Sequence, residues 1–169
     1  GLDQAIEAFT FHVKHTPWGI IQVHAYPYSA TESTFLVEMH EDVWRGAGFD
    51  ASESKSFPPG VSDDESVAKL AEIFAEELGD AKLLTNNSKW INFTTVRNQN
   101  WRYENIVLLG DSAHTAHFSI GSGTKLAMED SLALAACLHE HESVDAALEA
   151  YETERRPVVE STQRAAQAS

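Results

Sequence analysis

The residues best suited to chemistry lie in one stretch, 106–138, which reads IVLLGDSAHTAHFSIGSGTKLAMEDSLALAACL. Four apolar residues, 106–109, predict a buried strand that ends at Gly110. A loop follows, and a helix is expected to begin near Gly123. This order places the carboxylate of Asp111 at the carboxyl end of a strand, opposite a helix N-terminus with free amides. Ligands gather at that end of open α/β sheets, and a helix start favours an anion or a polarised oxygen.

The spacing and residue types of this stretch resemble the second FAD-binding motif, the Gly-Asp motif, of the class A flavoprotein aromatic monooxygenases (para-hydroxybenzoate hydroxylase fold). The segment AHFSIGSGTKLAMED is similar to the subgroup of salicylyl-CoA 5-hydroxylases and 2-aminobenzoyl-CoA monooxygenases. The resemblance covers essentially the whole chain and is strongest over 101–160. It implies FAD as cofactor, NAD(P)H as reductant and hydroxylation of an aromatic ring with O2. The implied substrate is an aromatic acyl-CoA, a 2-hydroxy- or 2-aminobenzoyl thioester.

The same resemblance implies roles for the cofactor-binding residues. Asp111 would accept a hydrogen bond from a ribityl hydroxyl of FAD, and Gly110 would let the backbone pass close to the cofactor. The amides of the turn into the helix would face the pyrimidine edge of the flavin, where the reduced ring carries negative charge. This turn consists of Gly121, Ser122, Gly123, Thr124 and Lys125. From the residues alone, the alternative is that Asp111 caps its own loop and that the glycines form a flexible turn.

Two histidines follow the Gly-Asp pair. The ring of His114 is interpreted as structural and paired with backbone. His117 lies nearer the turn and is the candidate catalytic residue, because a base that titrates near pH 7 would suit deprotonation of a phenol. The remaining histidines are scattered over strand-like stretches or stand two apart in an HEHE run at 139–142, where helical ligands would need a spacing of four. No metal site is predicted.

Composition limits the partners. The net charge of −14 argues against nucleic acid, and no apolar run approaches the length of a membrane span. The single cysteine, Cys137, is expected in the core, and a reducing cytoplasm is the expected location. Arg155 and Arg156 are interpreted as solvated surface residues. The four tryptophans are expected in the core or on sheet faces.

Hydrophobic periodicity predicts an α+β fold: an antiparallel sheet with a packed helix, joined to a strand-loop-helix piece of an FAD-binding α/β domain. The expected elements of the first part are strands at 9–14, 18–28 and 33–40, a helix at 62–78 and a further strand at 89–97. Ser62 and Glu65 are expected to form a capping box at the start of that helix, with Gly79 at its end.

A boundary is predicted near residue 100, between a substrate-binding part (1–100) and the C-terminal part of an FAD-binding domain (101–169). The second part should hold a helix at 124–138 and another that begins near Ser143 and is kinked or ended by Pro157. The strand 106–109 is apolar throughout, as in sheets covered on both faces, yet the chain offers it no βαβ partner.

No G-x-G-x-x-G fingerprint follows a strand in these 169 residues. We therefore expect a C-terminal fragment of a longer protein, with apolar surface exposed along 106–109 and no activity by itself. The rival hypothesis is a noncatalytic α+β binding domain whose Gly-Asp turn is only structural.

Overall fold

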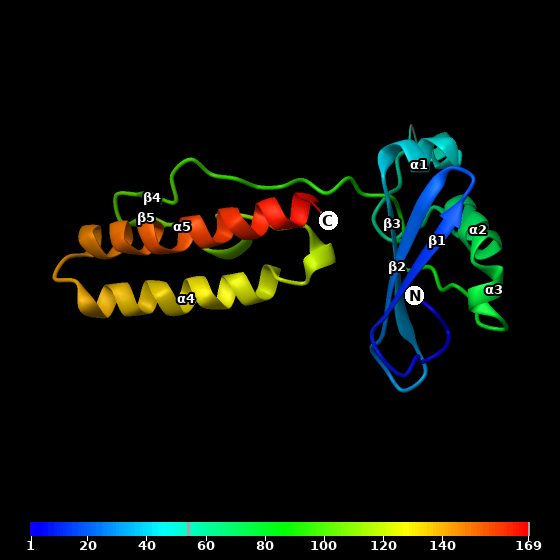
Figure 1. The fold of residues 1–169 in the computed structure, drawn as a ribbon, viewed down its shortest axis with the longest axis horizontal. Coiled ribbons are helices and arrows are strands. Elements are labelled where there is room, and N and C mark those ends of the chain that lie inside the picture. The colour runs from blue at the N-terminus through cyan, green and yellow to red at the C-terminus, as the bar shows by residue number, and fades with distance from the viewer. Residues whose placement is uncertain (54, 169) are drawn as a thin grey trace. The chain divides into compact units, whose positions relative to one another are not determined.

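The computed structural model describes residues 1–53 and 55–168, and the chain divides into two compact units (Figure 1). The first unit is Gly1–Ile91 and the second begins at Asn92, whereas the sequence analysis divides the chain near residue 100. The α+β class is confirmed. The first unit contains β1 (Thr10–Thr16), β2 (Gly19–Pro27), β3 (Ser33–Met39), α1 (Glu41–Gly46), η1 (Phe49–Ser52), α2 (Asp64–Ile73) and α3 (Ala75–Leu78). The second contains β4 (Arg102–Tyr103), β5 (Ile106–Val107), η2 (Gly110–Ser112), η3 (Phe118–Ile120), α4 (Gly123–Glu140) and α5 (Val144–Ala168).

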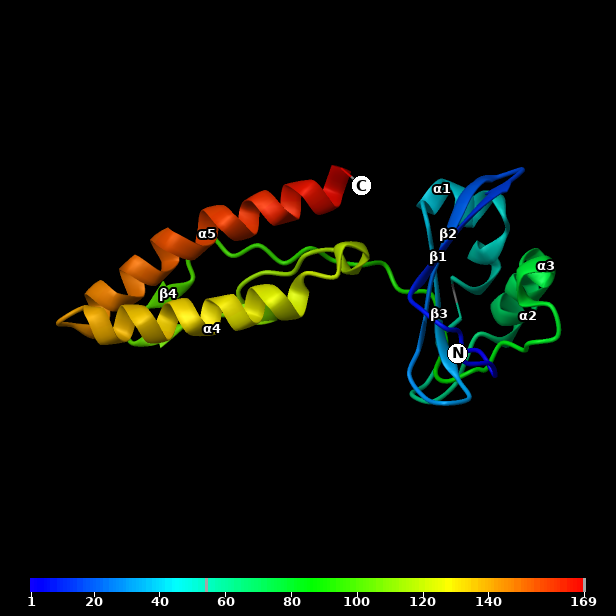
Figure 2. The ribbon, with the colours of Figure 1, turned by 60° about the horizontal axis from the view of Figure 1, so that its bottom comes forward.

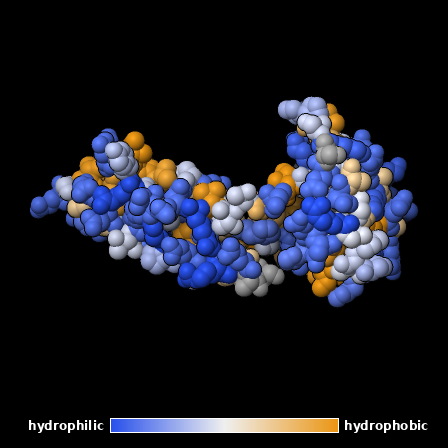
Figure 3. All heavy atoms as spheres, turned by 90° about the horizontal axis from the view of Figure 1, so that it is seen from above, coloured by the Kyte–Doolittle hydropathy of each residue, from blue (hydrophilic) through white to orange (hydrophobic). Residues whose placement is uncertain are grey.

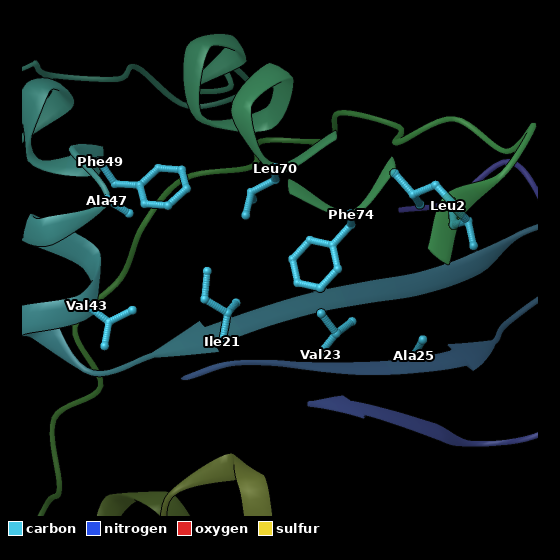
Figure 4. Close-up of a cluster of buried hydrophobic side chains, with 10 residues drawn as sticks. Leu2, Ile21, Val23, Ala25, Val43, Ala47, Phe49, Leu70 and Phe74 are labelled. Carbon is cyan, nitrogen blue, oxygen red and sulfur yellow. The ribbon is translucent and has the colours of Figure 1, made fainter. Parts of the chain in front are cut away.

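The first unit is built on a three-stranded antiparallel sheet in the order β1-β2-β3. The two-residue alternation of the strands puts Ile21, Val23 and Ala25 on the same face of β2, where all three are buried. Figure 4 shows these side chains directed toward Phe74 and Leu70, which belong to the helical layer on that face. The first unit therefore has one apolar core between sheet and helices, as the periodicity predicted.

The helix predicted at 62–78 is present as α2 and α3, which adjoin at Phe74. The predicted capping box is wrong in its residues. Asp63 is the N-cap, and its carboxylate accepts hydrogen bonds from the amide (3.2 Å) and the hydroxyl (2.6 Å) of Ser66. The hydroxyl of Ser62 instead accepts from the amide of Ser88 at 2.9 Å, so it ties a loop to the helix start. The cap therefore lies one residue later than the S-x-x-E pattern suggested.

The strand predicted at 89–97 is also wrong. These residues form only an isolated bridge between Arg97 and His114. Their polar groups find other partners: the indole of Trp90 donates to Ser66 Oγ at 2.9 Å, and the amide of Val96 donates to Thr115 Oγ1 at 2.7 Å. β-propensity alone does not make a strand, because a strand also needs a neighbour with which to share its backbone hydrogen bonds.

In the second unit, α4 and α5 lie side by side as an antiparallel hairpin (Figure 2). Pro157 was predicted to kink or to end the second helix. It does not end the helix, since α5 continues to Ala168. A proline removes one helical hydrogen bond, but Val159 and Gln163 beyond it are buried. We infer that their packing holds the last turns in helical form.

The apolar segment 106–109 is not a central strand. Within this segment only Ile106–Val107 forms a strand, and it pairs with Arg102–Tyr103 in a short antiparallel hairpin. The side chain of Ile106 is 61% exposed and that of Tyr103 is 71% exposed. Exposed apolar surface at this segment is therefore confirmed at its first residue, while 107–109 are half-buried.

The surfaces of both units are mainly hydrophilic on the face drawn in Figure 3, with hydrophobic residues in separate patches. Among the described residues, no helix combines the length and the apolar character that a membrane crossing requires. Apolar rings also gather on the outer face of the sheet: the ring centroids of Phe9 and Tyr26 are 5.4 Å apart, and those of Phe9 and Phe11 are 5.0 Å apart.

Candidate functional site

The Gly-Asp turn is the short helix η2, and it lies against α4. Gly110 is buried and has a φ of 57°, a left-handed conformation that side chains rarely adopt. A Cβ at this position would stand 3.1 Å from the Cβ of Ala127 in α4. Glycine is therefore required here twice, by the turn itself and by the close approach of the helix.

Asp111 is exposed at the tip of this turn. In the part of the chain that the structure describes, no hydrogen bond or ion pair engages its carboxylate. The hydroxyl of Ser112 makes the local bond instead, donating to the carbonyl of Leu109 at 2.8 Å. The alternative that Asp111 caps its own loop therefore finds no support, and its carboxylate is available to a ligand.

The start of α4 is open. Ser122 holds the N-cap position, but its hydroxyl donates to the carbonyl of Ile120 at 3.2 Å and caps nothing. The first helical bond runs from Leu126 N to Ser122 O, which leaves the amides of 123–125 without a partner among the described residues. No acidic residue stands in the first turn. This end of α4 therefore keeps the partial positive charge of a helix N-terminus unscreened.

The other residues predicted in this turn have mainly structural surroundings. Gly121 adopts a φ of 60°, and a Cβ there would meet nothing within 4 Å. The side chain of Lys125 is exposed and forms an ion pair with Glu129 one helical turn further on. Gly121 thus serves the turn geometry, since it is its positive φ, and no neighbouring atom, that favours glycine there.

A buried carboxylate that the sequence analysis missed holds the turn in place. Asp130 in α4 is fully buried, and its Oδ2 accepts from the amide of Gly110 (3.0 Å) and lies 2.7 Å from His114 Nε2. Its Oδ1 accepts from Arg155 Nε at 2.9 Å. Burial raises the pKa of Asp130, but the hydrogen bonds from Gly110, Arg155 and His114 outweigh burial and bring the pKa below its usual range. We call Gly110, His114, Asp130 and Arg155 the Asp130 cluster.

The interpretation of Arg155 as a solvated residue is wrong. Arg155 is only 7% exposed, and its Nη2 donates to Glu129 at 3.0 Å in addition to the bond with Asp130. Burial lowers the pKa of Arg155, yet the bonds to Asp130 and Glu129 prevail and raise it. A sequence signal for this pairing existed: Asp130 falls at helical spacing on the buried face of α4. The other members of that face are Leu126, Ala133 and Cys137.

His114 is structural, but its ring partner is a side chain rather than the backbone. Nε2 faces the carboxylate of Asp130, and the ring packs on Trp101 with centroids 5.0 Å apart. Both residues are buried. A buried polar ring of this kind is expected to have a partner, and a carboxylate satisfies it more strongly than a carbonyl would.

A second set of bonds fixes the loop that follows the turn. The amide of the Gln163 side chain donates to the carbonyls of Val96 (2.9 Å) and Thr115 (2.8 Å). The side chain of Asn98 donates to the carbonyls of Ser112 (2.9 Å) and Ala113 (2.7 Å). The loop 112–115 is thus held from two sides by side chains that are distant in sequence.

His117, the candidate catalytic residue, lies in a group of aromatic rings. Its ring centroid is 5.5 Å from that of Phe93 and 4.5 Å from that of Phe118. Its Nδ1 is 2.8 Å from Ser119 Oγ and accepts from the Ser119 amide at 3.4 Å. Nε2 has no hydrogen-bond partner among the described residues.

The described residues contain no group of three or more histidines, cysteines or carboxylates placed to hold a metal ion. Cys137 is buried, and burial raises the pKa of its thiol, which suits an unreactive core residue. The candidates for chemistry in the second unit therefore remain Asp111, the start of α4 and His117.

Comparison with known proteins identifies the family of the chain. Residues 7–166 match the family model described as FAD binding domain. The chain belongs to this family. It is 46% identical over 170 aligned residues to a salicyloyl-CoA 5-hydroxylase of Streptomyces sp. It is 47% identical over 164 residues to a 3-hydroxy-4-methyl-anthranilyl-[aryl-carrier protein] 5-monooxygenase of Streptosporangium sibiricum.

The alignments cover 100% and 97% of this chain but only 33% and 40% of those two relatives. The chain thus spans between a third and two fifths of their length. Among solved structures, the chain is similar to PqsL, a probable FAD-dependent monooxygenase from Pseudomonas aeruginosa. The match covers 99% of this chain and 46% of the PqsL chain. The TM-score is 0.65 at 22% sequence identity, so this likeness concerns the fold.

Proposed function

We propose that this chain is the part of an FAD-dependent aromatic monooxygenase that binds the ribityl chain and the pyrimidine edge of the flavin. The observation that carries the proposal is the free carboxylate of Asp111 on a turn packed against α4, whose N-terminus is uncapped. A carboxylate binds a sugar-like hydroxyl, and a helix N-terminus binds a polarised oxygen. Membership in the FAD-binding family supports the same assignment.

Each predicted cofactor residue has a role in this proposal. Asp111 accepts a hydrogen bond from a ribityl hydroxyl, and Gly110 keeps the turn against α4 so that Asp111 stays in position. The amides of Gly123, Thr124 and Lys125 donate to the pyrimidine oxygens, while Gly121 and Ser122 shape the approach. FAD, when bound, would supply the transfer of electrons from NAD(P)H to O2. The protein orients the reactants and stabilises negative charge at the helix start.

The proposed substrate is an aromatic ring carried as a thioester. The two relatives are named for salicyloyl-CoA and for an anthranilyl group on a carrier protein, a 2-hydroxy- and a 2-aminobenzoyl group respectively. We therefore propose a 2-hydroxy- or 2-aminobenzoyl-CoA, with NAD(P)H and O2 as co-substrates. In line with the net charge of −14, we propose neither nucleic acid nor a membrane as a partner. We also propose a cytoplasmic location.

One observation is also compatible with the rival function, a noncatalytic α+β binding domain. Gly110 is explained by packing on Ala127 and by its bond to Asp130, so a purely structural Gly-Asp turn accounts for the glycine. It does not account for Asp111, whose carboxylate supports nothing in the described fold. Asp111 therefore separates a flavin-binding domain from a noncatalytic one.

The test is the full-length protein that contains this chain, carrying Asp111→Ala. The wild-type protein should purify with flavin absorbance and consume O2 and NAD(P)H when a 2-hydroxy- or 2-aminobenzoyl-CoA is added. Loss of a hydrogen bond to a charged group costs about 1.5–3 kcal/mol, which corresponds to about a 10- to 150-fold weaker affinity for FAD. The variant should lose FAD on gel filtration while its circular dichroism is unchanged.

Asp80→Ala is the matched control, because Asp80 is an exposed carboxylate in the other unit. It should retain FAD like the wild type. Equal FAD affinity in the wild type and Asp111→Ala would refute the role of Asp111. A wild-type protein without flavin and without turnover would refute the monooxygenase assignment and favour the noncatalytic domain.

The 169-residue chain by itself should bind FAD weakly and hydroxylate nothing. The pyrophosphate contacts of this cofactor come from a G-x-G-x-x-G turn after a strand, and no such turn occurs in this sequence. Isothermal titration of the chain with FAD measures this directly. Tight binding at one FAD per chain would show that the cofactor site is complete without that fingerprint.

A further inference from the structure

Three rings of the second unit form a small aromatic cluster, and two of them belong to the segment that directly precedes α4. Phe93, His117 and Phe118 contact one another pairwise, with centroids 4.5 to 5.5 Å apart. Phe93 is 54% exposed, and the two others are partly exposed. Such a cluster offers a planar ligand an apolar wall and, through His117, one polar atom.

The hydrogen bonds of His117 decide what that polar atom is. The backbone amide of Ser119 can only donate, and it is directed at Nδ1. The Ser119 hydroxyl, 2.8 Å from the same nitrogen, can donate as well. The Ser119 amide can bond to Nδ1 only if that nitrogen carries no proton, so this bond favours the neutral ring with its proton on Nε2, whereas the hydroxyl by itself fits either tautomer.

Nε2 is the nitrogen with no partner among the described residues. A neutral ring in this tautomer presents N–H at the open position and its lone pair to Ser119. To act as a base at Nε2, the ring would have to move its proton to Nδ1 and lose the bond from the Ser119 amide. The local structure therefore opposes the general-base role that the sequence analysis assigned to His117.

We propose that His117 is a specificity-determining hydrogen-bond donor. Its Nε2–H would bind an acceptor oxygen of the aromatic acyl group, while Phe93 and Phe118 contact the ring. This inference rests on the proposed function and deepens it. It commits the site to a ligand with an oxygen acceptor at the ring or on the adjacent carbonyl, and it leaves deprotonation of the substrate to another group.

The first experiment concerns the chain alone and does not depend on the proposed function. A long-range 1H–15N correlation spectrum of the 169-residue chain reports which imidazole nitrogen carries the proton, and His117→Gln identifies the signals of His117. We expect a protonated Nε2 and an acceptor Nδ1 in the neutral ring. Ser119→Ala keeps the amide donor and should keep this tautomer. A proton on Nδ1 would overturn the proposal.

The second experiment uses the full-length oxidised protein without NAD(P)H, so that ligand binding is measured without turnover. The probe is 2-hydroxybenzoyl-CoA, followed by the change in flavin absorbance. His117→Gln keeps an N–H near the Nε2 position and should bind within about threefold of wild type. His117→Phe keeps a ring but no donor and should bind about tenfold or more weakly, the size expected for one lost hydrogen bond.

Benzoyl-CoA separates the two sources of the acceptor oxygen. If Nε2–H meets the ring hydroxyl, the difference between Gln and Phe vanishes with benzoyl-CoA. If it meets the thioester carbonyl, the difference persists. Both results support the donor role. Equal loss of affinity in His117→Gln and His117→Phe would overturn it. In a separate turnover assay with NAD(P)H, an equal loss of kcat in both variants with KM unchanged would mean a base and would also overturn it. If the full-length protein contains no flavin, the proposed function is refuted, while the tautomer measured in the first experiment is unaffected.

Discussion

The two compact units are stabilised by different kinds of interior. The first buries mainly apolar side chains between sheet and helices, with Phe74, Ile21 and Val23 completely inaccessible. The second also has an apolar cluster, but within it lie the paired charges of Asp130 and Arg155. Apolar contacts are non-directional and specify that elements pack. Directional bonds to a buried carboxylate specify where one turn of backbone stands.

This difference has an energetic consequence. Burying an ion pair costs desolvation that its attraction often only balances, so such a pair is weak support for stability. In the Asp130 cluster, the carboxylate of Asp130 bonds to Gly110, which directly precedes Asp111, and to His114, which follows Asp111 three residues later. We infer that it is retained for the position of the Gly-Asp turn, whereas the interior of the first unit is retained for stability.

Asp130→Ala is one of the two changes with the largest expected effect. It leaves the guanidinium of Arg155 buried without its main partner, and breaking a buried pair in this way costs about 3–5 kcal/mol. Urea unfolding of the chain, followed by circular dichroism, measures the loss. Asp111→Ala is the control, since an exposed carboxylate without partners should change stability by no more than about 0.5 kcal/mol. A cost below about 1 kcal/mol for Asp130→Ala would remove the distinction between the units.

Phe74→Ala tests the interior of the first unit. Phe74 is fully buried and contacts Phe35 at 5.6 Å between centroids, so truncation should cost about 3–5 kcal/mol through lost burial and a cavity. The comparison is sharpened by rescue. Adding Arg155→Met to Asp130→Ala removes the unpaired charge and should recover part of the loss. If the double variant were no more stable than Asp130→Ala alone, the loss would reflect packing, and both interiors would be of one kind.

Gly110→Ala should cost about 1–3 kcal/mol, because it combines a left-handed φ with a Cβ 3.1 Å from Ala127. Gly121→Ala is the matched variant: its φ is similarly positive, at 60°, but open space surrounds the added methyl. It should cost about 1 kcal/mol, the strain alone. The difference in urea midpoint between the two variants measures the close approach of α4. Equal costs would show that the backbone conformation is the whole effect.

The smallest expected effect is a dependence on pH. The pKa of Asp130 is lower in the folded chain than in the unfolded one, where about 3.9 is usual. Its contribution to stability is therefore complete above that unfolded value and is lost as the pH falls through the folded pKa. Unfolding midpoints at pH 6 and at pH 3 should differ less in Asp130→Asn than in the wild type. An identical pH dependence in both would contradict this linkage.

The sequence alone determined the features that depend on neighbours in the chain. Alternating apolar residues located β1, β2 and β3, and helical spacing located α2 and α4. The glycine before Asp111 and the open turn at 121–125 were also correctly located, because turns and helix starts are specified by local residue types. The same local stretch carried the resemblance to the FAD-binding family that the family model confirms.

Only the tertiary structure decided the interactions between residues distant in sequence. Asp130 and Arg155 are 25 residues apart, and Gln163 and Val96 are 67 apart. Residues 89–97 have strand-like composition but bond to side chains, since a strand exists only where a neighbour supplies its hydrogen bonds. Hydrophobic periodicity indicates which face of a helix or strand is buried. It contains no information on which polar side chain from another element bonds to that face.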